Sequence, residues 1–302
     1  MAKKKSYDDY LFEQDYSKST VEGYLRDSEK FIGWCNFKGL DPKYIDYKTC
    51  LVYVKDIQRP TKGKSNSKAT ISKHIGALKI YFNYLIDENY RGNNPMQNIN
   101  IRGVRRSINH HLLEYEELED LFYSYSTHNI QPPNCPDVAV RDKVIIGLMI
   151  YQGLNATALM SLKMEHIQME KGKIYVPSTR KTNSRELELK SPQMLSLAQY
   201  LQEDRSVLQD KIQCYTDDLF PRNIERTGIL LHSLFKRLQV INYKVKNAKQ
   251  IRASVITHWL KLHNIRKAQY MVGHRYISST EKYLQNDIES LQEVISIGHP
   301  MK

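Results

Sequence analysis

The chain has 302 residues, enough for two domains of ordinary size, and its 45 lysines and arginines against 33 acidic residues give a net charge of +12. No stretch approaches the roughly twenty apolar residues that a membrane span needs, and the charged N-terminus runs into Tyr7-Asp8-Asp9 without the apolar segment of a signal peptide. The cysteines are too scattered for a zinc site or a disulfide framework (Cys35, Cys50, Cys135 and Cys214). We therefore expect no membrane association and no metal, and a cytoplasmic location.

The positive charge is spread over both halves of the chain. Residues 1–105 carry 19 basic and 12 acidic residues, and the remainder carries 26 and 21, so the net charges are +7 and +5. Such a distribution is expected if both halves contact one polyanion, such as a nucleic acid. Many soluble proteins are equally basic without such a partner, so charge alone does not decide the matter.

The first part of the chain is predicted to be all helical. A capping-box pattern at 19–22 indicates the start of a helix with apolar residues at helical spacing, and a second helix is predicted over 48–57. The polar, basic stretch 61–68 reads as a loop. A long amphipathic helix over 69–89 follows and is expected to end before Gly92 and Pro95. We place this helical domain at residues 1–97.

A basic, extended linker over 98–112 is predicted to lead into a mixed domain at 113–302. Its first helices are expected at 113–121 and 144–151. Two short strands at 173–176 and 186–189 flank a polar turn over 180–185. Mostly helical segments complete the domain (191–203, 228–241, 246–263 and 265–272), followed by a stretch that holds Tyr283 and an amphipathic tail helix near 288–295. The predicted fold class is mostly α with a small β-sheet: a helical domain followed by a mixed α+β domain.

The last fifty residues contain the most informative spacing. Arg252 is followed twenty-one residues later by Gly273-His274, and Tyr283 lies nine residues after His274, at the end of the run 278–283. This order resembles the C-terminal active site of the tyrosine recombinases, also called the phage-integrase family. The resemblance covers nearly the whole chain. It implies a helical core-binding domain, a linker and a tyrosine-recombinase catalytic domain, with the two domains closing around double-stranded DNA.

The resemblance also implies a role for each residue. Tyr283 would be the nucleophile, because a phosphotyrosine link conserves the bond energy and can be reversed. Arg252 would bind the scissile phosphate with its planar guanidinium, and His274 would donate to a phosphate oxygen or relay a proton. Lys249 stands where the family usually has a histidine, one helical turn before Arg252. Lys181, in the turn between the strands, would be the general acid that protonates the leaving 5′ oxygen. This chemistry needs no cofactor and no metal.

Each of these residues also has an ordinary structural interpretation. A single tyrosine is usually a packing residue, and a single histidine more often caps a helix or fills a core. Lys249 and Arg252 could belong to a solvated basic face that includes Lys244 and Lys246. The turn at 180–185 could likewise be an ordinary basic surface. The order and spacing of the residues together favour the catalytic interpretation.

One position departs from the family pattern. Where the family has Gly-Leu-Arg-x-x-Glu-Leu, this chain has Gly-Leu-Asn-Ala-Thr-Ala-Leu at 153–159, so Asn155 replaces the expected arginine. Loss of one transition-state donor typically costs about 10²–10³ in rate. Either another cation compensates, with Arg275, Arg180 and Arg185 as candidates, or the chain binds DNA without cutting it. We favour compensation, because the other expected residues are all present.

The loop over 61–68 and the start of the helix after it resemble the parts of the core-binding domain that face DNA. Its lysines would mainly contact phosphates (Lys62, Lys64, Lys68, Lys73 and Lys79), whereas Thr70, Ser72 and Asn66 are candidate base readers. A solvated basic loop is the alternative for each residue taken singly.

The predicted function is a tyrosine-type site-specific recombinase, or integrase, that cleaves and rejoins DNA through a 3′-phosphotyrosyl intermediate. Integration or excision of a mobile element is favoured over chromosome-dimer resolution. We expect a tetramer on two DNA sites, an accessory DNA-bending or directionality factor, and a nucleoid-associated location. In the family the tail helix packs on a neighbouring protomer; packing on its own domain is the alternative. The competing functions are a catalytically impaired DNA-binding protein that regulates a related recombinase, and site-independent DNA relaxation.

Overall fold

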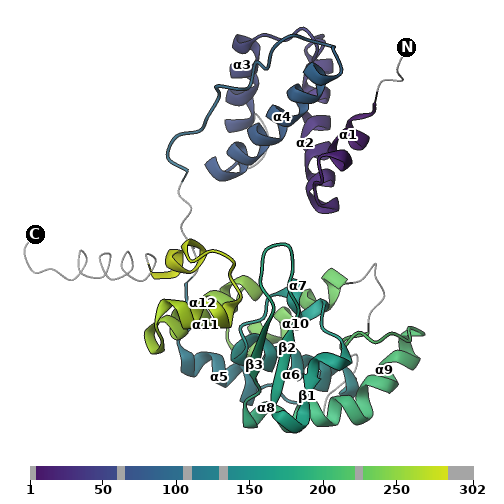
Figure 1. Cartoon of the computed structure of the whole chain (residues 1–302), viewed down its shortest axis with the longest axis vertical. Coiled ribbons are helices and arrows are strands. Elements are labelled where there is room, and N and C mark those ends of the chain that lie inside the picture. Colours follow the sequence, from purple (N-terminus) through teal and green to yellow (C-terminus); the bar gives the residue numbers. More distant parts are fainter. Residues whose placement is uncertain (1–4, 60–64, 105–110, 129–134, 222–226, 285–302) are drawn as a thin grey trace, which may run out of the picture. The chain divides into compact units, whose positions relative to one another are not determined.

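A computed structural model of the chain describes residues 5–59, 65–104, 111–128, 135–221 and 227–284 (Figure 1). The chain divides into two compact units, Met1–Arg106 and Ser107–Lys302. The predicted lysines Lys62 and Lys64 and the predicted tail helix lie outside the described residues. Within the described residues, no helix is long and apolar enough to cross a membrane, and no cluster of side chains could hold a metal ion.

The first unit is built from helices that pack around an aromatic core. They are α1 (Tyr7–Glu13), α2 (Lys18–Phe37), α3 (Tyr47–Gln58) and α4 (Lys68–Asp87). Phe31 lies at the centre, with its ring edge-on to Tyr53 at 4.8 Å and to Phe82 at 5.5 Å between centroids. All three rings are almost fully buried. Burial of such rings, each worth about 1.5–3 kcal/mol, holds the helices together.

The sequence predicted α2, α3 and α4 with small errors at their ends, whereas α1 was not predicted. Helix α2 begins at Lys18 after an extended Ser17, so the capping box predicted at 19–22 lies inside the helix and does not start it. Helix α4 is capped by Ser67, whose hydroxyl accepts from the backbone N–H of Thr70, and it ends at Asp87 because Asn89 takes a left-handed conformation with φ +59°. Ile99, which was expected in the linker, is buried in the core of the first unit.

The second unit holds an antiparallel sheet in the order β1-β2-β3, formed by Ile167–Gln168, Lys173–Val176 and Arg185–Glu188. The two predicted strands are β2 and β3, and the register pairs Lys173 with Glu188 and Val176 with Arg185. The two-residue strand β1 was not predicted. The turn between β2 and β3 projects beyond the sheet (Figure 1).

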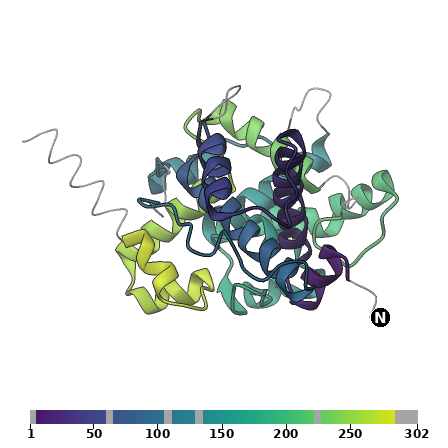
Figure 2. The same cartoon turned by 90° about the horizontal axis from the view of Figure 1, so that it is seen from above.

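The rest of this unit is mostly helical, which confirms the predicted fold class. Its helices include α5 (Tyr115–Tyr123), α6 (Pro136–Tyr151), α7 (Ala156–Met160), α8 (Ser191–Gln199), α9 (Arg205–Ile212), α10 (Thr227–Ile241), α11 (Ala248–Leu262) and α12 (Ile265–Val272). Helix α6 is central, because most of its residues are buried. A π-helical segment, Tyr200–Asp204, joins α8 to α9, so the helix predicted over 191–203 continues further. Helices α11 and α12 lie at the opposite end of the unit from α9 in both views (Figures 1 and 2).

Candidate active site

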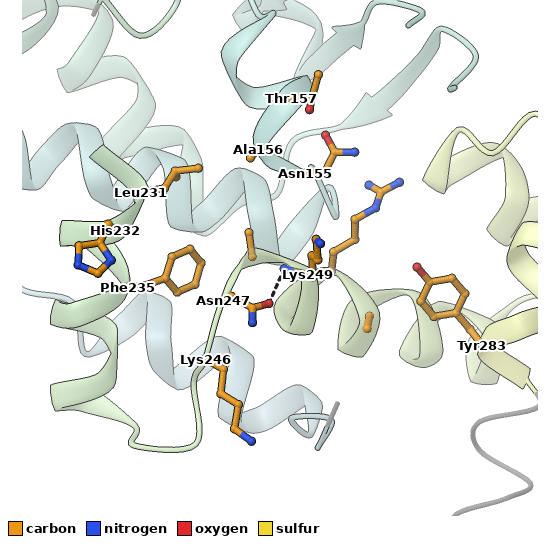
Figure 3. A pocket seen from close by; sticks show the side chains of 13 residues that line it. Asn155, Ala156, Thr157, Leu231, His232, Phe235, Lys246, Asn247, Lys249 and Tyr283 are labelled. Carbon is orange, nitrogen blue, oxygen red and sulfur yellow. Dashed lines mark hydrogen bonds between the residues drawn. The ribbon is translucent and has the colours of Figure 1, made fainter. Parts of the chain in front are cut away.

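A pocket of about 1080 Å³ opens beside the N-terminus of α11 (Figure 3). Its lining comes from α10, α11, the segment before and in α7, and the helical stretch 278–284 (Asn155, Ala156, Thr157, Leu231, His232, Phe235, Lys246, Asn247, Ala248, Lys249, Arg252, Ala253 and Tyr283). The hydroxyl of Tyr283 points into the pocket from the side opposite the α10 residues (Figure 3). The pocket therefore brings Lys249 and Arg252 of α11 together with Asn155 and Tyr283, which are far from them in the sequence.

Arg252 is buried at the wall of this pocket, with 8% of its surface exposed. Its guanidinium donates to two backbone carbonyls, those of Gly153 and of Val272, the latter at 3.0 Å. Burial lowers the pKa of Arg252. Among the residues that the structure describes, no carboxylate forms an ion pair with it. A buried guanidinium that faces a pocket without a counter-charge is suited to bind an anion.

The N-terminus of α11 presents Lys249 to the same pocket. Asn247 caps the helix, because its side-chain oxygen accepts from the backbone N–H groups of Lys249 and Gln250, at 3.0 and 3.1 Å. Lys249 is exposed and lies one turn before Arg252. The helix N-terminus and the ammonium thus both add positive potential at the mouth of the pocket.

Asn155, the residue that replaces the expected arginine, has a defined local role. Its side-chain oxygen accepts from the backbone N–H of Ala158 at 2.8 Å, so it is the N-cap of α7. Asparagine is among the best residues for this position. Its side chain lines the pocket that Arg252 and Tyr283 share. The substitution therefore keeps the backbone in order but brings no positive charge.

His274 and Tyr283 are neighbours. Their rings stack with centroids 6.0 Å apart, at 24° between the planes. Nδ1 of His274 lies 2.9 Å from the hydroxyl of Thr280, which is fully buried. Burial first, and then the charges of Arg252, Arg185 and Lys282, lower the pKa of His274 to about 4, so the ring is neutral near pH 7. Burial raises the pKa of Tyr283, and the charge of Arg252 opposes that shift.

The turn between β2 and β3 is fixed against the segment that carries His274. The backbone N–H of Asn183 donates to the carbonyl of Gly273 at 2.9 Å, and Thr182 forms a bridge with His274. Arg275 adds a further link, since its guanidinium donates to the carbonyl of Thr179 at 3.1 Å. The exposed Lys181 is therefore held next to a residue that pairs with His274.

Arg185, at the start of β3, is the most deeply buried of the three candidate compensating cations. It is 3% exposed, whereas Arg180 and Arg275 are exposed. Its Nε donates to the carbonyl of Met271 at 2.8 Å. Burial and the charge of Arg252 lower its pKa to about 10, and no carboxylate among the described residues pairs with it. Two buried guanidiniums thus interact electrostatically without a counter-charge.

In the first unit, the structure separates the candidate DNA-binding residues onto two surfaces. Lys68 and Lys79 lie against the chain that follows α4: Nζ of Lys79 donates to Asn100 at 3.0 Å, and Nζ of Lys68 lies near Gly103. Thr70 and Lys73 instead border a cavity of about 450 Å³ between α2, α3 and α4. Ser72 is half-buried and does not line this cavity.

The structure adds residues that the sequence alone did not reveal. Arg26 and Lys30 of α2 line the same cavity as Lys73, with the buried side chains of Asp27 and His74 beneath them. This basic cluster forms because α2 packs against α4, so the sequence of either helix alone does not reveal it. Thr280 lies in the run 278–283 that ends at Tyr283, six residues after His274, but its bond to His274 depends on the turn at 275–277.

Two family models match the chain. The model described as "Phage integrase family" matches residues 113–290, and "Phage integrase, N-terminal SAM-like domain" matches residues 5–89. Two relatives are similar over almost their whole lengths. They are "Tyrosine recombinase XerC" of Bacillus pumilus (24% identity, 97% of this chain and 94% of the relative) and "Tyrosine recombinase XerD" of Listeria monocytogenes (24%, 96% and 95%).

Solved structures share the fold. A XerH site-specific recombinase bound to a palindromic difH substrate aligns with a TM-score of 0.70 at 20% identity, over 94% of this chain and 81% of that one. The Tn1549 transposon integrase in complex with a circular intermediate DNA aligns with a TM-score of 0.65 at 14% identity, over 95% and 98%. At these identities the likeness concerns the fold alone.

Proposed function

The chain belongs to the phage integrase family of tyrosine recombinases, and on that premise we propose that it is a site-specific recombinase that cleaves and rejoins DNA through a 3′-phosphotyrosyl intermediate. The observation that carries this proposal is the pocket itself. The hydroxyl of Tyr283 points into it, and the buried guanidinium of Arg252, without a carboxylate partner among the described residues, forms part of its wall. A nucleophile beside an anion site is what strand cleavage requires.

In the proposed reaction the scissile phosphate occupies this pocket. The oxygen of Tyr283 gives its proton to solvent water in the open pocket and attacks phosphorus, the Tyr283 O–P bond forms, and the bond from phosphorus to the 5′ oxygen breaks. Lys181 gives a proton to that 5′ oxygen, which leaves as a hydroxyl. Arg252 and Lys249 bind the non-bridging oxygens and stabilise the charge that develops there. Attack by a 5′ hydroxyl from another strand reverses each step and completes the exchange.

We assign the compensation for Asn155 to Arg185. The location of Arg185 supports this assignment. Its charge is buried beside Arg252 and against the segment that carries His274, so it raises the positive potential of the site without contact with solvent. Arg275 is engaged with Thr179, and Arg180 is exposed and makes no hydrogen bond or ion pair among the described residues. Neither has the burial that strengthens an electrostatic interaction.

The wider assignments follow from the family. We propose double-stranded DNA as the partner, a tetramer on two sites as the working assembly, an accessory DNA-bending or directionality factor, and a nucleoid-associated location. The departures at Asn155 and Lys249 indicate a divergent lineage, which favours integration or excision of a mobile element. The alternative, a DNA-binding regulator of a related recombinase, is favoured by one observation, the missing arginine at Asn155.

Covalent adduct formation tests the proposal. Nicked suicide duplexes drawn from DNA that flanks the gene would be incubated with the protein and separated on denaturing gels. We expect the wild type to form a protein–DNA adduct that Tyr283→Phe does not form, because that change removes only the attacking oxygen. Tyr123→Phe, on an exposed tyrosine of α5, is the matched control and should leave the adduct unchanged. Specific binding without an adduct would favour the regulator.

A further inference from the structure

The hydrogen bond between His274 and Thr280 determines which ring nitrogen carries the proton. The hydroxyl of Thr280 lies 2.9 Å from Nδ1 of His274. Within the described residues this is the only hydrogen bond that the Thr280 side chain makes. Thr280 is 0% exposed, so its hydroxyl cannot donate to bulk water. Nε2 of His274 has no hydrogen-bond partner among the described residues.

A hydroxyl group can donate one hydrogen bond and accept two, and only donation uses its proton. If Nδ1 carried the proton, Thr280 would accept, and its own hydrogen would be a buried donor without a partner. Leaving a buried donor unsatisfied costs about 1–3 kcal/mol. If Thr280 donates to Nδ1, both groups are satisfied and the imidazole proton lies on Nε2. The second arrangement is therefore favoured.

The tautomer is defined only for a neutral ring, because a charged imidazolium has no acceptor nitrogen. The surroundings of His274 keep its ring neutral. Arg252, Arg185 and Lys282 all act on the ring with positive charge, and burial adds to their effect, so its pKa lies near 4. The ring of Tyr283, neutral near pH 7, stacks on it and adds no negative charge.

We propose that Thr280 is a positioning residue that fixes His274 as the neutral tautomer with its proton on Nε2. The catalytic consequence rests on the proposed function: Nε2–H donates to a non-bridging oxygen of the scissile phosphate, and it cannot accept the proton of Tyr283 at the same atom. Thr280 thereby decides between the two roles that the sequence left open for His274, in favour of phosphate donor.

Nuclear magnetic resonance of the full chain tests the tautomer without any cleavage reaction. Long-range ¹H–¹⁵N correlation spectra distinguish a protonated from an unprotonated ring nitrogen, and His274→Gln assigns the signals. At pH 7 we expect a protonated Nε2 and an unprotonated, hydrogen-bonded Nδ1. The same pattern is expected in Thr280→Ser, which keeps the hydroxyl. A proton on Nδ1 overturns the proposal, whether or not the protein cleaves DNA.

Adduct kinetics test the catalytic consequence. Thr280→Val keeps the shape of the side chain and removes the hydroxyl, so we expect about a tenfold slower rate of adduct formation, equivalent to one hydrogen bond. Thr280→Ser should retain most of the rate. In a His274→Gln background, Thr280→Val should have no further effect, because Thr280 acts through His274. An equal additional loss in that background would overturn the consequence.

Thr257→Val is the matched control for these rates. Thr257 is buried in α11, and its hydroxyl has no hydrogen-bond partner within the described residues, so the change removes a buried hydroxyl without affecting His274. We expect its adduct rate to equal that of the wild type. A loss in Thr257→Val equal to that in Thr280→Val would show that any buried hydroxyl in this region matters and would contradict a specific role for Thr280.

Discussion

Arg185 and Gly273 lie in direct contact: a Cβ atom at Gly273 would overlap Nη1 of Arg185 and would lie 2.9 Å from its Cζ. Gly273 also has φ +79°, the left-handed conformation that ends α12. Glycine is thus required here twice, once by the backbone and once by the guanidinium. The contact joins β3 to the segment that carries His274.

Gly273→Ala should therefore damage both stability and cleavage. We expect the free energy of unfolding to fall by roughly 1–3 kcal/mol, from backbone strain and displacement of Arg185, and adduct formation to fall with it. Gly172→Ala is the matched control, since Gly172 has φ +59° but open space around its Cα. Urea titration of both variants separates the two causes. Equal losses would mean that the contact with Arg185 contributes nothing.

Arg185→Met should slow adduct formation by about 10²–10³, the cost of removing one transition-state cation, if Arg185 compensates for the missing arginine. Asn155→Arg should then restore much of the rate in the Arg185→Met background, because it returns a cation to the pocket. Rates from suicide duplexes measure both effects. Arg180→Met, on an exposed residue of the turn that precedes β3, should change the rate little. No rescue by Asn155→Arg would mean that Arg185 acts only by holding the turn.

Substitutions at Asn155 can separate its role as the cap of α7 from the effect of charge in the pocket. Asn155→Ala should lower the free energy of unfolding by about 0.5–2 kcal/mol, because the cap of α7 is removed. Asn155→Asp keeps an acceptor for the N–H of Ala158 and should retain most of the stability. It also places a negative charge in the pocket with Arg252, so DNA cleavage should fall sharply. A fully active Asn155→Asp would contradict the location of the phosphate.

The fold could largely be predicted because apolar spacing specifies long helices. The helix predicted over 69–89 is observed as Lys68–Asp87, since its stripe of buried residues includes Ile71, Ile75 and Leu78. Short elements were missed: α1 and α7 have seven and five residues, and β1 has two. Elements this short contain too few residues to show a periodic pattern of apolar side chains. Their existence depends on caps and tertiary contacts.

The site residues were predicted as a set, but their surroundings were not. The alternation of β3 held a usable signal, because Arg185 and Leu187 lie on the same buried face of the strand. The alternation of side chains along the strand predicts that Arg185 is buried. Its contact with Gly273 could not be predicted in this way, because the residues that it contacts there lie 86 or more positions further along the chain. The catalytic roles of Tyr283, Arg252, Lys249, His274 and Lys181 stay predictions until adducts are measured.

Stability should depend on pH through His274. Its pKa is about 4 in the folded protein against 6.5 for the unperturbed group, so between these values the unfolded chain binds a proton that the folded protein lacks. Stability therefore rises with pH through this window and falls on acidification, by roughly 1–3 kcal/mol from pH 6.5 to 4. Urea titrations at several pH values measure it. His274→Gln should flatten this part of the profile; an unchanged profile would assign the dependence to other groups.

DNA binding by the first unit should depend on salt through the basic segment 61–68. Replacing Lys62, Lys64 and Lys68 together by Ala should flatten the plot of log affinity against log salt, by about 0.9 for each phosphate that a lysine no longer neutralises. The physical reason is that fewer counterions leave the DNA when fewer lysines bind it. Fluorescence anisotropy across a salt series measures the slope.

A second triple variant separates local binding from net charge. Lys18, Lys38 and Lys48 are exposed lysines elsewhere in the same unit, and their joint replacement by Ala removes the same charge from a different surface. We expect this variant to keep the wild-type slope, because screening at physiological salt limits distant charges to a range of about 8 Å. Equal flattening in both variants would point to net charge. A wild-type slope in the variant of Lys62, Lys64 and Lys68 would remove the segment 61–68 from the DNA-binding surface.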